Sequence, residues 1–501
     1  MSSKNNISNN TSDDKNLSMR VVRGGFWVFL IRIISESLYL AKIIILANIL
    51  SPHDFGLFGI ALLMLDIMKL FSRTGFEAAL IQKKEDIESY LDSTWTVIIL
   101  RNLGLFIIML LIAPVTAFYF EAPEATLLIQ IIGFELIFGA FTNIGFIYFR
   151  KELKFSKEFI FRLTGQLIDF FITIYTVLIL RNVWAIIIGL LTGTAAKCVI
   201  SYFLHPYRPH LSTDFKKANE LWSFGKWAFI SGLLLFLIIE ADDVFVGIVL
   251  GVTVLGFYQM AYRISNLPAT EITNVVYDVT YPAYSKLQDD IPNLREAYLK
   301  VLKITAFSSF LIGGLIFAFA FDFTKIFLGD KWYPMVLAMQ VLVLWGMIRS
   351  VGHTTVSIFQ ARGKPGIITK ILAFQVILMA IFIYPLTIQY NIMGTSASIV
   401  FAALISTLIF FYKVVKIIKC GRWDFCKLII LPLINMVIMV LSIFFIKIYW
   451  NISIGIIELG MLGVFAILMY FGITLIFEKF FNYKIIKDLF KLYRQLTTQK
   501  L

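Results

Sequence analysis

Charged residues are scarce in this chain. Asp, Glu, Lys and Arg make up only 15% of its 501 residues, whereas 59% are hydrophobic and the mean hydropathy is +0.82. A typical soluble domain has about 25% charged residues. The composition therefore excludes a soluble globular protein and indicates a protein that crosses the membrane many times.

Cysteine and histidine are also rare, with three and four residues in the whole chain. Cys198 lies in an apolar run, and Cys420 and Cys426 lie in one polar break, so the sequence contains no disulfide framework. The segment HPYRPH at 205–210 holds two histidines without a thiol or carboxylate nearby, which favours a structural or surface loop over a metal site. We expect neither a metal nor a cofactor.

The sequence has instead many apolar runs of membrane-spanning length. A spanning helix needs roughly 20 mainly apolar residues, and because hydrocarbon offers no water to the backbone, such runs must be helical. The expected spans lie at 24–49, 55–73, 94–118, 127–149, 160–180, 183–204, 222–249, 254–280, 304–321, 335–360, 367–389, 391–412, 427–449 and 453–477. The predicted class is an all-α membrane protein with about fourteen transmembrane helices.

Basic residues are placed unevenly between these spans. About 34 Lys and Arg residues lie on one side of the membrane, and four lie on the other, namely Arg181, Lys325, Lys331 and Lys447. The positive-inside rule then places both termini in the cytoplasm. This topology explains the net charge of +13, with attraction to anionic headgroups as a secondary effect, so no nucleic-acid partner is expected.

The chain contains an internal repeat. Residues 24–61 align with 224–261 without gaps, and the identical pairs include Gly25 with Gly225, Trp27 with Trp227, Phe29 with Phe229, Leu50 with Leu250 and Gly56 with Gly256. Chance alignment of apolar chains is the alternative, and the matched Trp and Gly residues argue against it. A second similarity relates YFRKELKF at 148–155 to FQARGKPG at 359–366, each ending a span at the predicted cytoplasmic side.

The repeat predicts how the chain is organised. Six spans in each half give both halves one orientation, so we expect two six-helix lobes in pseudo-two-fold relation around a central cavity. The expected parts are a disordered cytoplasmic tail at 1–20, lobes at 21–210 and 211–420, two additional helices at 421–480 and a basic tail at 481–501. The polar break shared by the halves is interpreted as a tight outer turn, containing Pro52 and Gly56 in one copy and Gly251 and Gly256 in the other.

Charged residues within the spans gather on corresponding helices of the two halves. A charge at the bilayer centre costs roughly 2.5 kcal/mol or more on insertion scales, so such a residue usually faces a cavity or a partner. The candidate cavity residues are Arg32, Glu36, Tyr39, Tyr258, Tyr262, Arg263 and Arg349. Arg32 and Glu36 lie four residues apart on one helix face, and a structural ion pair is the alternative for them.

Three acidic residues, Glu240, Asp242 and Asp243, cluster on the seventh span. They are candidates for proton or sodium coupling, and pairing with Arg32 or Arg263 is the alternative. Both interpretations remain open at the level of the sequence.

Other residues within the spans predict local features. Pro268 interrupts the eighth span, which predicts a kink and makes this residue a candidate hinge. Lys69, Arg101 and Lys197 lie one or two turns from the cytoplasmic end, and we expect them to extend their charges to the membrane interface.

Three segments carry a family resemblance. LSPHDFGLFGIA at 50–61, GFEAALIQKKED at 75–86 and YPAYSKLQDD at 281–290 resemble the polysaccharide-transporter flippases of the multidrug/oligosaccharidyl-lipid/polysaccharide (MOP) exporter superfamily. The resemblance implies two six-helix lobes around a central cavity and cationic residues in that cavity, for which Arg32 and Arg263 are the best matches. It implies no universal motif for a coupling ion.

The function implied by this resemblance is transport, not catalysis. A flippase of this kind moves a polyprenyl-pyrophosphate-linked oligosaccharide across the cytoplasmic membrane by alternating access, for cell-surface polysaccharides such as the O-antigen of lipopolysaccharide. The expected partners are this substrate and membrane lipids, with polysaccharide-assembly proteins as further candidates.

Two alternatives follow from the same residues. One is a multidrug or organic-cation antiporter of the same superfamily, against which Arg32, Arg263 and Arg349 argue. A membrane polysaccharide polymerase is less favoured, because such an enzyme usually carries its catalytic residues on a sizeable outer loop, and the longest one expected here is only about Asp322–Pro334. The sequence has no nucleotide-binding loop or nucleophile constellation.

Overall fold

The computed structural model describes residues 30–72, 80, 87–152, 155–212, 214–450, 455–481 and 483–488. Every regular element in these ranges is helical, which confirms the predicted all-α class. Nine helices within the described ranges are long and apolar enough to cross a membrane. The chain divides into two compact units, Met1–Gly256 and Phe257–Leu501, and each is described here by itself. The lobe boundary expected near residue 210 stays a prediction.

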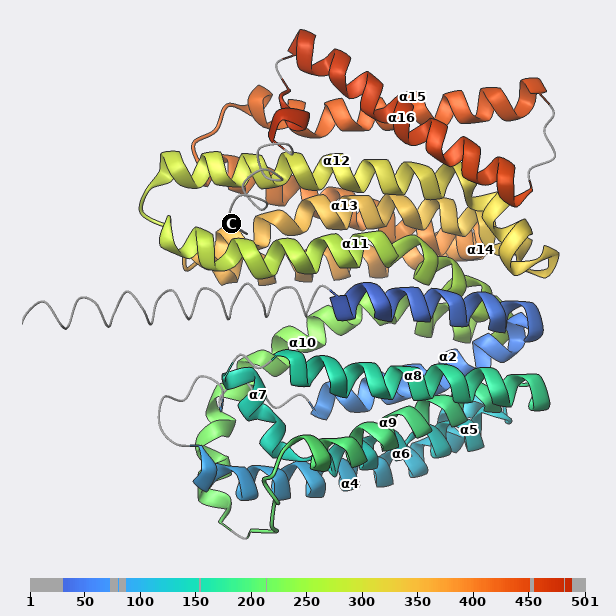
Figure 1. Cartoon of the computed structure of the whole chain (residues 1–501), viewed down its shortest axis with the longest axis vertical. Coiled ribbons are helices and arrows are strands. Elements are labelled where there is room, and N and C mark those ends of the chain that lie inside the picture. The colour runs from blue at the N-terminus through green and yellow to red at the C-terminus, as the bar shows by residue number, and fades with distance from the viewer. Residues whose placement is uncertain are drawn as a thin grey trace, which may run out of the picture. The chain divides into compact units, whose positions relative to one another are not determined.

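Unit 1 is a bundle of helices that follow one another along the chain. Its elements are a helix at 30–49, α2 (Pro52–Ser72), α4 (Glu88–Tyr119), α5 (Ala125–Ile132), α6 (Phe134–Ala140), α7 (Ile147–Lys151), α8 (Phe155–Leu180), α9 (Trp184–Leu204), α10 (Phe215–Leu250) and the first turn of α11 (Val252–Lys286). Helices α8 and α9 pack along each other, and α2 lies against α4, α5 and α10 (Figure 1).

Unit 2 contains the rest of α11 and the helices that follow it. These are α12 (Ile291–Phe323), a π-helical turn at Thr324–Leu328, a 3-10 segment at Asp330–Met335, α13 (Val336–Ala361), α14 (Pro365–Ile417), α15 (Arg422–Trp450) and α16 (Ile456–Phe481). Helix α12 packs on α13 and α15, and α13 packs on α14 (Figure 1). The buried core of this unit contains Tyr298, Phe359 and Phe410.

The spans expected at 367–389 and 391–412 are both contained in α14. The helix is interrupted at Tyr390 and Asn391, whose backbone angles are not helical, and Asn391 has a φ of +50°. A Cβ atom on Gly394 would lie 1.9 Å from the carbonyl oxygen of Leu386. The chain therefore reverses between the two legs of α14 with almost no loop, and the missing side chain of Gly394 permits the close approach.

The additional helix α15 is attached to α12 by a buried ion pair. Lys447 on α15 pairs with Asp322, and its Nζ donates a hydrogen bond of 2.8 Å to the carbonyl oxygen of Ala318. The same Nζ lies 4.7 Å from the ring centroid of Phe319. Ion pairs and cation–π contacts are strong where water is excluded, so α15 is an integrated part of unit 2.

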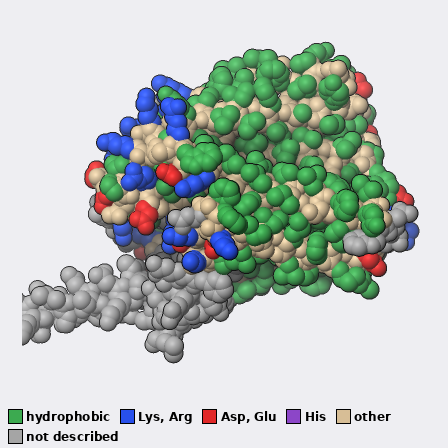
Figure 2. Space-filling view, turned by 90° about the horizontal axis from the view of Figure 1, so that it is seen from above, with side chains coloured by type: hydrophobic (Ala, Val, Ile, Leu, Met, Phe, Trp, Pro, Cys, Tyr) green, Lys and Arg blue, Asp and Glu red, His purple; other side chains and the backbone are tan. Residues whose placement is uncertain are grey.

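Basic side chains gather at one end of unit 2. Figure 2 views this unit from the side of α15 and α16, with Lys and Arg side chains concentrated at the left and hydrophobic side chains covering most of the remaining surface. This separation of basic from hydrophobic side chains agrees with the uneven distribution of Lys and Arg between the polar breaks of the sequence.

Helix α2 begins where the sequence supplies a capping box. Ser51 and Asp54 exchange hydrogen bonds, since the backbone N–H and the hydroxyl of Ser51 donate to Asp54 Oδ2 at 2.9 and 2.6 Å and the N–H of Asp54 donates to Ser51 Oγ at 3.2 Å. Pro52 occupies the first helical position, where its missing N–H has no cost. Gly56 therefore lies inside the helix, and its predicted place in the turn is wrong.

The glycines of the repeat allow two backbones to touch. A Cβ on Gly56 would lie 1.9 Å from the carbonyl oxygen of Val252, and a Cβ on Gly256 would lie 1.9 Å from that of Pro52. The two contacts are reciprocal across the repeat: Gly56 meets Val252, the repeat partner of Pro52, and Gly256 meets Pro52, the repeat partner of Val252. Close approach between α2 and the start of α11, rather than turn geometry, explains these glycines, and Gly251 with a φ of +88° forms the turn.

A polar cluster lies beside this contact. His53 Nδ1 is 3.3 Å from Thr253 Oγ1, and His53 Nε2 is 3.1 Å from Glu124 Oε1. A hydrogen bond with its own backbone lowers the pKa of Glu124, His53 lowers it further, and partial burial opposes both. The cluster thus ties α2 to the turn before α5 and to the first turn of α11.

The HPYRPH segment packs against the rest of unit 1. The hydroxyl of Tyr207 donates to Asp92 Oδ1 at 2.7 Å, and the ring of His205 stacks on Tyr148 with centroids 5.5 Å apart. These contacts agree with the structural loop that the sequence favoured.

We predict that Gly256→Ala and Gly56→Ala each lower the free energy of unfolding by about 1–3 kcal/mol, because a methyl group would force two backbones apart. The measurement is the midpoint of thermal unfolding in detergent. The matched control is Gly104→Ala within α4, where a Cβ meets no atom within 4 Å, and this change should be neutral or stabilising by about 0.5–1 kcal/mol. Equal shifts in all three variants would contradict the close-contact role.

We predict that Glu124 stabilises the fold only while it is ionised. Its folded-state pKa is lower than the ordinary 4.5, so its contribution is present above that value and is lost as the pH falls through the lowered pKa. Wild type should therefore unfold at a higher temperature than Glu124→Gln at pH 7, and the difference should vanish in acid. The same titration with Glu121→Gln, a neighbouring acid in the same turn, serves as control, and an unchanged difference in acid would refute the prediction.

Candidate functional site

The predicted site residues of unit 1 lie on two helices. Arg32, Glu36 and Tyr39 are half-buried on the helix at 30–49. Of the three acids on α10, Asp242 and Asp243 are buried, with exposed fractions of 1% and 8%, and Glu240 is half-buried. Burial of these carboxylates within an apolar bundle is consistent with both interpretations made from the sequence, a coupling site and a set of ion pairs.

The predicted site residues of unit 2 form an aromatic and cationic group. The ring of Tyr262 lies 6.5 Å from that of Tyr258 and 5.2 Å from that of Trp345, centroid to centroid. The guanidinium carbon of Arg349 lies 5.0 Å from the Trp345 ring centroid. Tyr258 and Trp345 are buried, whereas Tyr262 and Arg349 are half-buried. Arg349 is therefore held by the face of an aromatic ring.

Trp345 was not selected from the sequence, although its spacing contained a signal. It precedes Arg349 by four residues, which places both on one face of α13. Arg263 is half-buried on α11, next to Tyr262. Helix α11 runs through Pro268, whose side chain lies outside those described, so the predicted kink stays a prediction.

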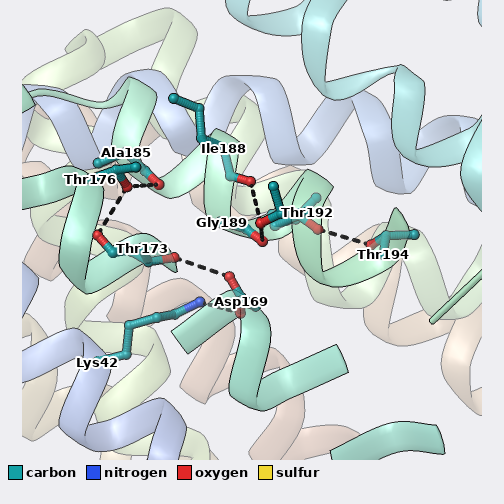
Figure 3. A network of polar contacts seen from close by, with 10 residues as sticks. Lys42, Asp169, Thr173, Thr176, Ala185, Ile188, Gly189, Thr192 and Thr194 are labelled. Atoms are coloured by element: carbon teal, nitrogen blue, oxygen red, sulfur yellow. Dashed lines mark hydrogen bonds and ion pairs between the residues drawn. The ribbon is translucent and has the colours of Figure 1, made fainter. Parts of the chain in front are cut away.

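A buried polar network joins the helix at 30–49 to α8. Lys42 Nζ lies 2.6 Å from Asp169 Oδ2, and the hydroxyl of Thr173 donates to Asp169 Oδ1 at 3.1 Å (Figure 3). The hydroxyl of Ser35 donates to Gln166 Oε1 at 2.6 Å, about two turns from Lys42 on one helix and about one turn from Asp169 on the other. The side chains of Lys42 and Asp169 are 13% and 26% exposed, so the pair is partly buried.

Two glycines of α9 make room for this network. A Cβ on Gly189 would lie 1.8 Å from Thr173 Oγ1, and a Cβ on Gly193 would lie 2.7 Å from Asp169 Cβ. Small residues allow membrane helices to approach closely and to share polar contacts. Figure 3 shows Gly189 beside the chain of hydroxyl contacts that runs along α8 and α9.

Lys69 and Arg101 bind partners within unit 1. Lys69 Nζ lies 3.0 Å from Glu135 Oε1 on α6, and Arg101 donates from Nη2 to Ser72 Oγ at 2.9 Å. The aliphatic part of Lys197 lies against Gly165, where a Cβ would come within 2.3 Å of Lys197 Cε. Lys69 and Arg101 thus each have a polar partner on a neighbouring helix, and their extension to the membrane interface stays a prediction.

The missed residue of the network is Asp169. It is an acid within an apolar span, and Gln166 and Thr173 lie three and four residues from it on the same face. This helical spacing of polar residues was the signal. The partner of Asp169 could not be identified from the sequence, because Lys42 is 127 residues away.

Residues 45–337 match the family described as polysaccharide biosynthesis protein. The chain belongs to this family. One similar member of the curated proteins is the lipopolysaccharide biosynthesis protein WzxC of Escherichia coli (strain K12), which is 24% identical over 411 residues, 80% of this chain and 82% of WzxC. The resemblance stated from the sequence is confirmed.

Solved transporters share the fold of this family member. The lipid II flippase MurJ, in an inward closed conformation, superposes with a TM-score of 0.74 and 16% identity over 91% of this chain and 99% of MurJ. A multidrug resistance MATE family transporter of the MOP superfamily, in an inward-facing conformation, gives a TM-score of 0.58 and 16% identity over 78% and 98% of the chains. These likenesses show the MOP-type fold and its many membrane helices.

We predict that Lys42 and Asp169 are energetically coupled. Lys42→Met or Asp169→Asn alone should destabilise the protein by about 1–3 kcal/mol, less than the cost of breaking a fully buried pair, because both groups are partly exposed. The double variant should lose clearly less than the sum of the two losses. A double-mutant cycle on unfolding in detergent measures the coupling.

The control cycle uses the exposed pair Lys427 and Asp424 on α15, whose atoms lie 2.8 Å apart. Its coupling should stay below about 1 kcal/mol, since water screens surface pairs. Additive losses at Lys42 and Asp169 would show that the network does not hold the two helices together.

Proposed function

We propose that the protein is a flippase that moves a polyprenyl-pyrophosphate-linked oligosaccharide across the cytoplasmic membrane for cell-surface polysaccharide synthesis, with both termini in the cytoplasm. The main support for this proposal is that the chain belongs to the polysaccharide biosynthesis protein family. The described part of the chain also contains many helices that are long and apolar enough to cross a membrane. The proposal is that the chain carries lipid-anchored sugars across the bilayer by transport, without catalysis.

The physical problem of this reaction is the polar headgroup. Sugar hydroxyls and a pyrophosphate cannot enter hydrocarbon without losing their hydrogen bonds to water, at several kcal/mol for each unsatisfied group. A hydrated, partly cationic path between the lobes removes most of this cost, while the polyprenyl tail stays in the lipid. This path is the central cavity expected from the sequence.

The arginines are proposed to bind the pyrophosphate. Arg32 in unit 1 and Arg263 in unit 2 are half-buried on helices that carry few other cations. A guanidinium matches the geometry of phosphate oxygens and forms two parallel hydrogen bonds with them. Arg349 is a third candidate, and its position over Trp345 fixes the guanidinium in one orientation.

The tyrosines are proposed to contact the sugar rings. Tyr39 and Tyr262 are half-buried and can present a ring to the cavity, with Glu36 as a neighbouring hydrogen-bond acceptor. Tyr258 is fully buried beside Tyr262, so its ring supports the position of Tyr262 in this conformation. An aromatic ring offers a sugar a flat apolar face and a phenolic hydroxyl at its edge.

Alternating access is proposed to couple to an ion through α10. Glu240, Asp242 and Asp243 are the candidate acids, and proton or sodium binding would neutralise a carboxylate that is costly to bury. Pro268 is the candidate hinge within α11. Polysaccharide-assembly proteins are further candidate partners.

We predict that Arg32→Ala and Arg263→Ala each lower the rate of substrate transfer about tenfold or more. A hydrogen bond to a charged group contributes about 1.5–3 kcal/mol, and 1.36 kcal/mol corresponds to tenfold in rate. The assay follows a fluorescent polyprenyl-pyrophosphate oligosaccharide in proteoliposomes with an impermeant quencher. The control is Lys427→Ala, which removes a cation on α15 and should leave the rate unchanged.

The outcomes separate the function from its site. If both arginine variants transfer the substrate at the wild-type rate, the protein is still a flippase, but Arg32 and Arg263 do not bind the pyrophosphate. Absence of transfer by the wild type, together with efflux of an organic cation, would assign the protein to the multidrug alternative.

A further inference from the structure

A basic hollow lies at the predicted cytoplasmic end of unit 2, and none of its lining residues belongs to the proposed transport path. Its volume is about 390 Å³, and its described lining consists of Arg362, Lys364, Ile367, Lys413, Lys416 and Ile417. Of these described residues, four are cationic and none is acidic. Such a group of like charges is unfavourable by itself, so the hollow is suited to an anion.

The connection between α13 and α14 builds one wall of the hollow. Gly363 adopts a φ of +65°, the N–H of Lys364 donates to the carbonyl oxygen of Phe359 at 2.8 Å, and the N–H of Gly363 donates to that of Gln360 at 3.0 Å. This is the Schellman arrangement that ends a helix. Pro365 then starts α14 at once, so Arg362 and Lys364 are fixed on either side of a very short turn.

This turn is the segment FQARGKPG at 359–366, which is similar to YFRKELKF at 148–155 and has no part in the proposed transport mechanism. The turn also places the N-terminus of α14 at the hollow, and the positive end of the helix dipole favours a negative charge there. The segment therefore contributes two side-chain cations and a helix terminus to the same place.

The second wall comes from the other leg of α14. Lys413 and Lys416 lie three residues apart on one face of the helix and are both exposed. Lys416 Nζ lies 5.8 Å from the ring centroid of Tyr412. These cations face the wall formed by Arg362 and Lys364 across the hollow.

Arg362 presents a donor that the protein does not satisfy. Its Nη1 donates to the carbonyl oxygen of Gln288, which anchors the guanidinium. Its Nε is buried and has no acceptor among the described residues. A buried N–H without an acceptor is unfavourable, and an anion in the hollow would offset part of that cost through its attraction to the guanidinium charge.

The surroundings of the hollow indicate the source of the anion. Ile367 and Ile417 add an apolar part to the lining, and the legs of α14 beyond it expose Leu408 and Tyr412 to 57% and 55%. Exposed apolar side chains on a membrane helix face lipid tails, and tyrosine favours the level of the headgroups. A free phosphate would use only the cations, whereas a lipid uses both parts.

We propose that this hollow binds the phosphate headgroup of an anionic phospholipid, whose tails lie along the apolar legs of α14. Basic pockets between membrane helices on the cytoplasmic side have the charge and depth that such headgroups require. The site is independent of the transported substrate.

The test counts lipids bound to the full-length protein in detergent by native mass spectrometry. Short-chain phosphatidylglycerol is titrated against wild type and Lys413→Ala/Lys416→Ala, with phosphatidylcholine of the same chain length, inorganic phosphate and pyrophosphate as separate arms. The apparent Kd for phosphatidylglycerol should rise about tenfold or more in the variant, since two of four charged contacts are lost. Lys413→Arg/Lys416→Arg should retain binding and shows that the fold tolerates changes here.

The matched control is Lys286→Ala/Lys370→Ala, which removes the same charge from exposed positions that do not line the hollow. Its apparent Kd should stay within about twofold of wild type. If Lys413→Ala/Lys416→Ala and Lys286→Ala/Lys370→Ala weaken phosphatidylglycerol binding equally, the effect is general charge attraction and the hollow is not a specific site. Equal binding of phosphatidylcholine, or equal competition by inorganic phosphate or pyrophosphate alone, would overturn the lipid assignment.

Discussion

A charged side chain inside hydrocarbon must find its counter-charge within the protein, and this constraint organises both units. In unit 1, Lys42 pairs with Asp169 and Lys69 with Glu135. In unit 2, Lys447 pairs with Asp322. Each pair joins two different helices, so the charges that make the spans costly to insert also determine which helices pack together and in what rotation. Apolar side chains alone would leave that rotation weakly determined, because lipid tails are as apolar as the helices.

The helices could be predicted from the sequence because their cause is local. The length of an apolar run decides whether it spans, and the capping box at Ser51 and Asp54 or the Gly363 turn fixes a helix end within a few residues. The family could also be recognised from short segments. The two legs of α14 are an example, since the expected spans at 367–389 and 391–412 leave one residue between them and the structure interrupts the helix at Tyr390 and Asn391.

The contacts of the candidate site could not be predicted, because they depend on how each helix is rotated against its neighbours. The residues around Lys42 do not indicate that it pairs with Asp169 on α8. Likewise, the residues around Tyr262 on α11 do not indicate that its ring lies against Trp345 on α13. The repeat predicts a special place for Gly56, but the turn predicted for it is wrong. A glycine can indicate either an unusual backbone angle or a close approach of two backbones, and the sequence alone does not distinguish them. The basic hollow could not be predicted either, because its cations come from positions about 50 residues apart that the reversal of α14 brings together.

The contact between Gly56 and Gly256 bears on the origin of the chain. The two contacts are reciprocal, with Pro52 against Gly256 and Val252 against Gly56, as they would be in a two-fold symmetric homodimer of a single copy of the repeat. In such a dimer any substitution occurs twice at the same contact, so a side chain at this glycine would be doubly disfavoured. In a fused chain the two copies can differ, and His53 faces Thr253 at repeat-equivalent positions. At Gly56 and Gly256 the backbone contact leaves no room for a side chain in either copy.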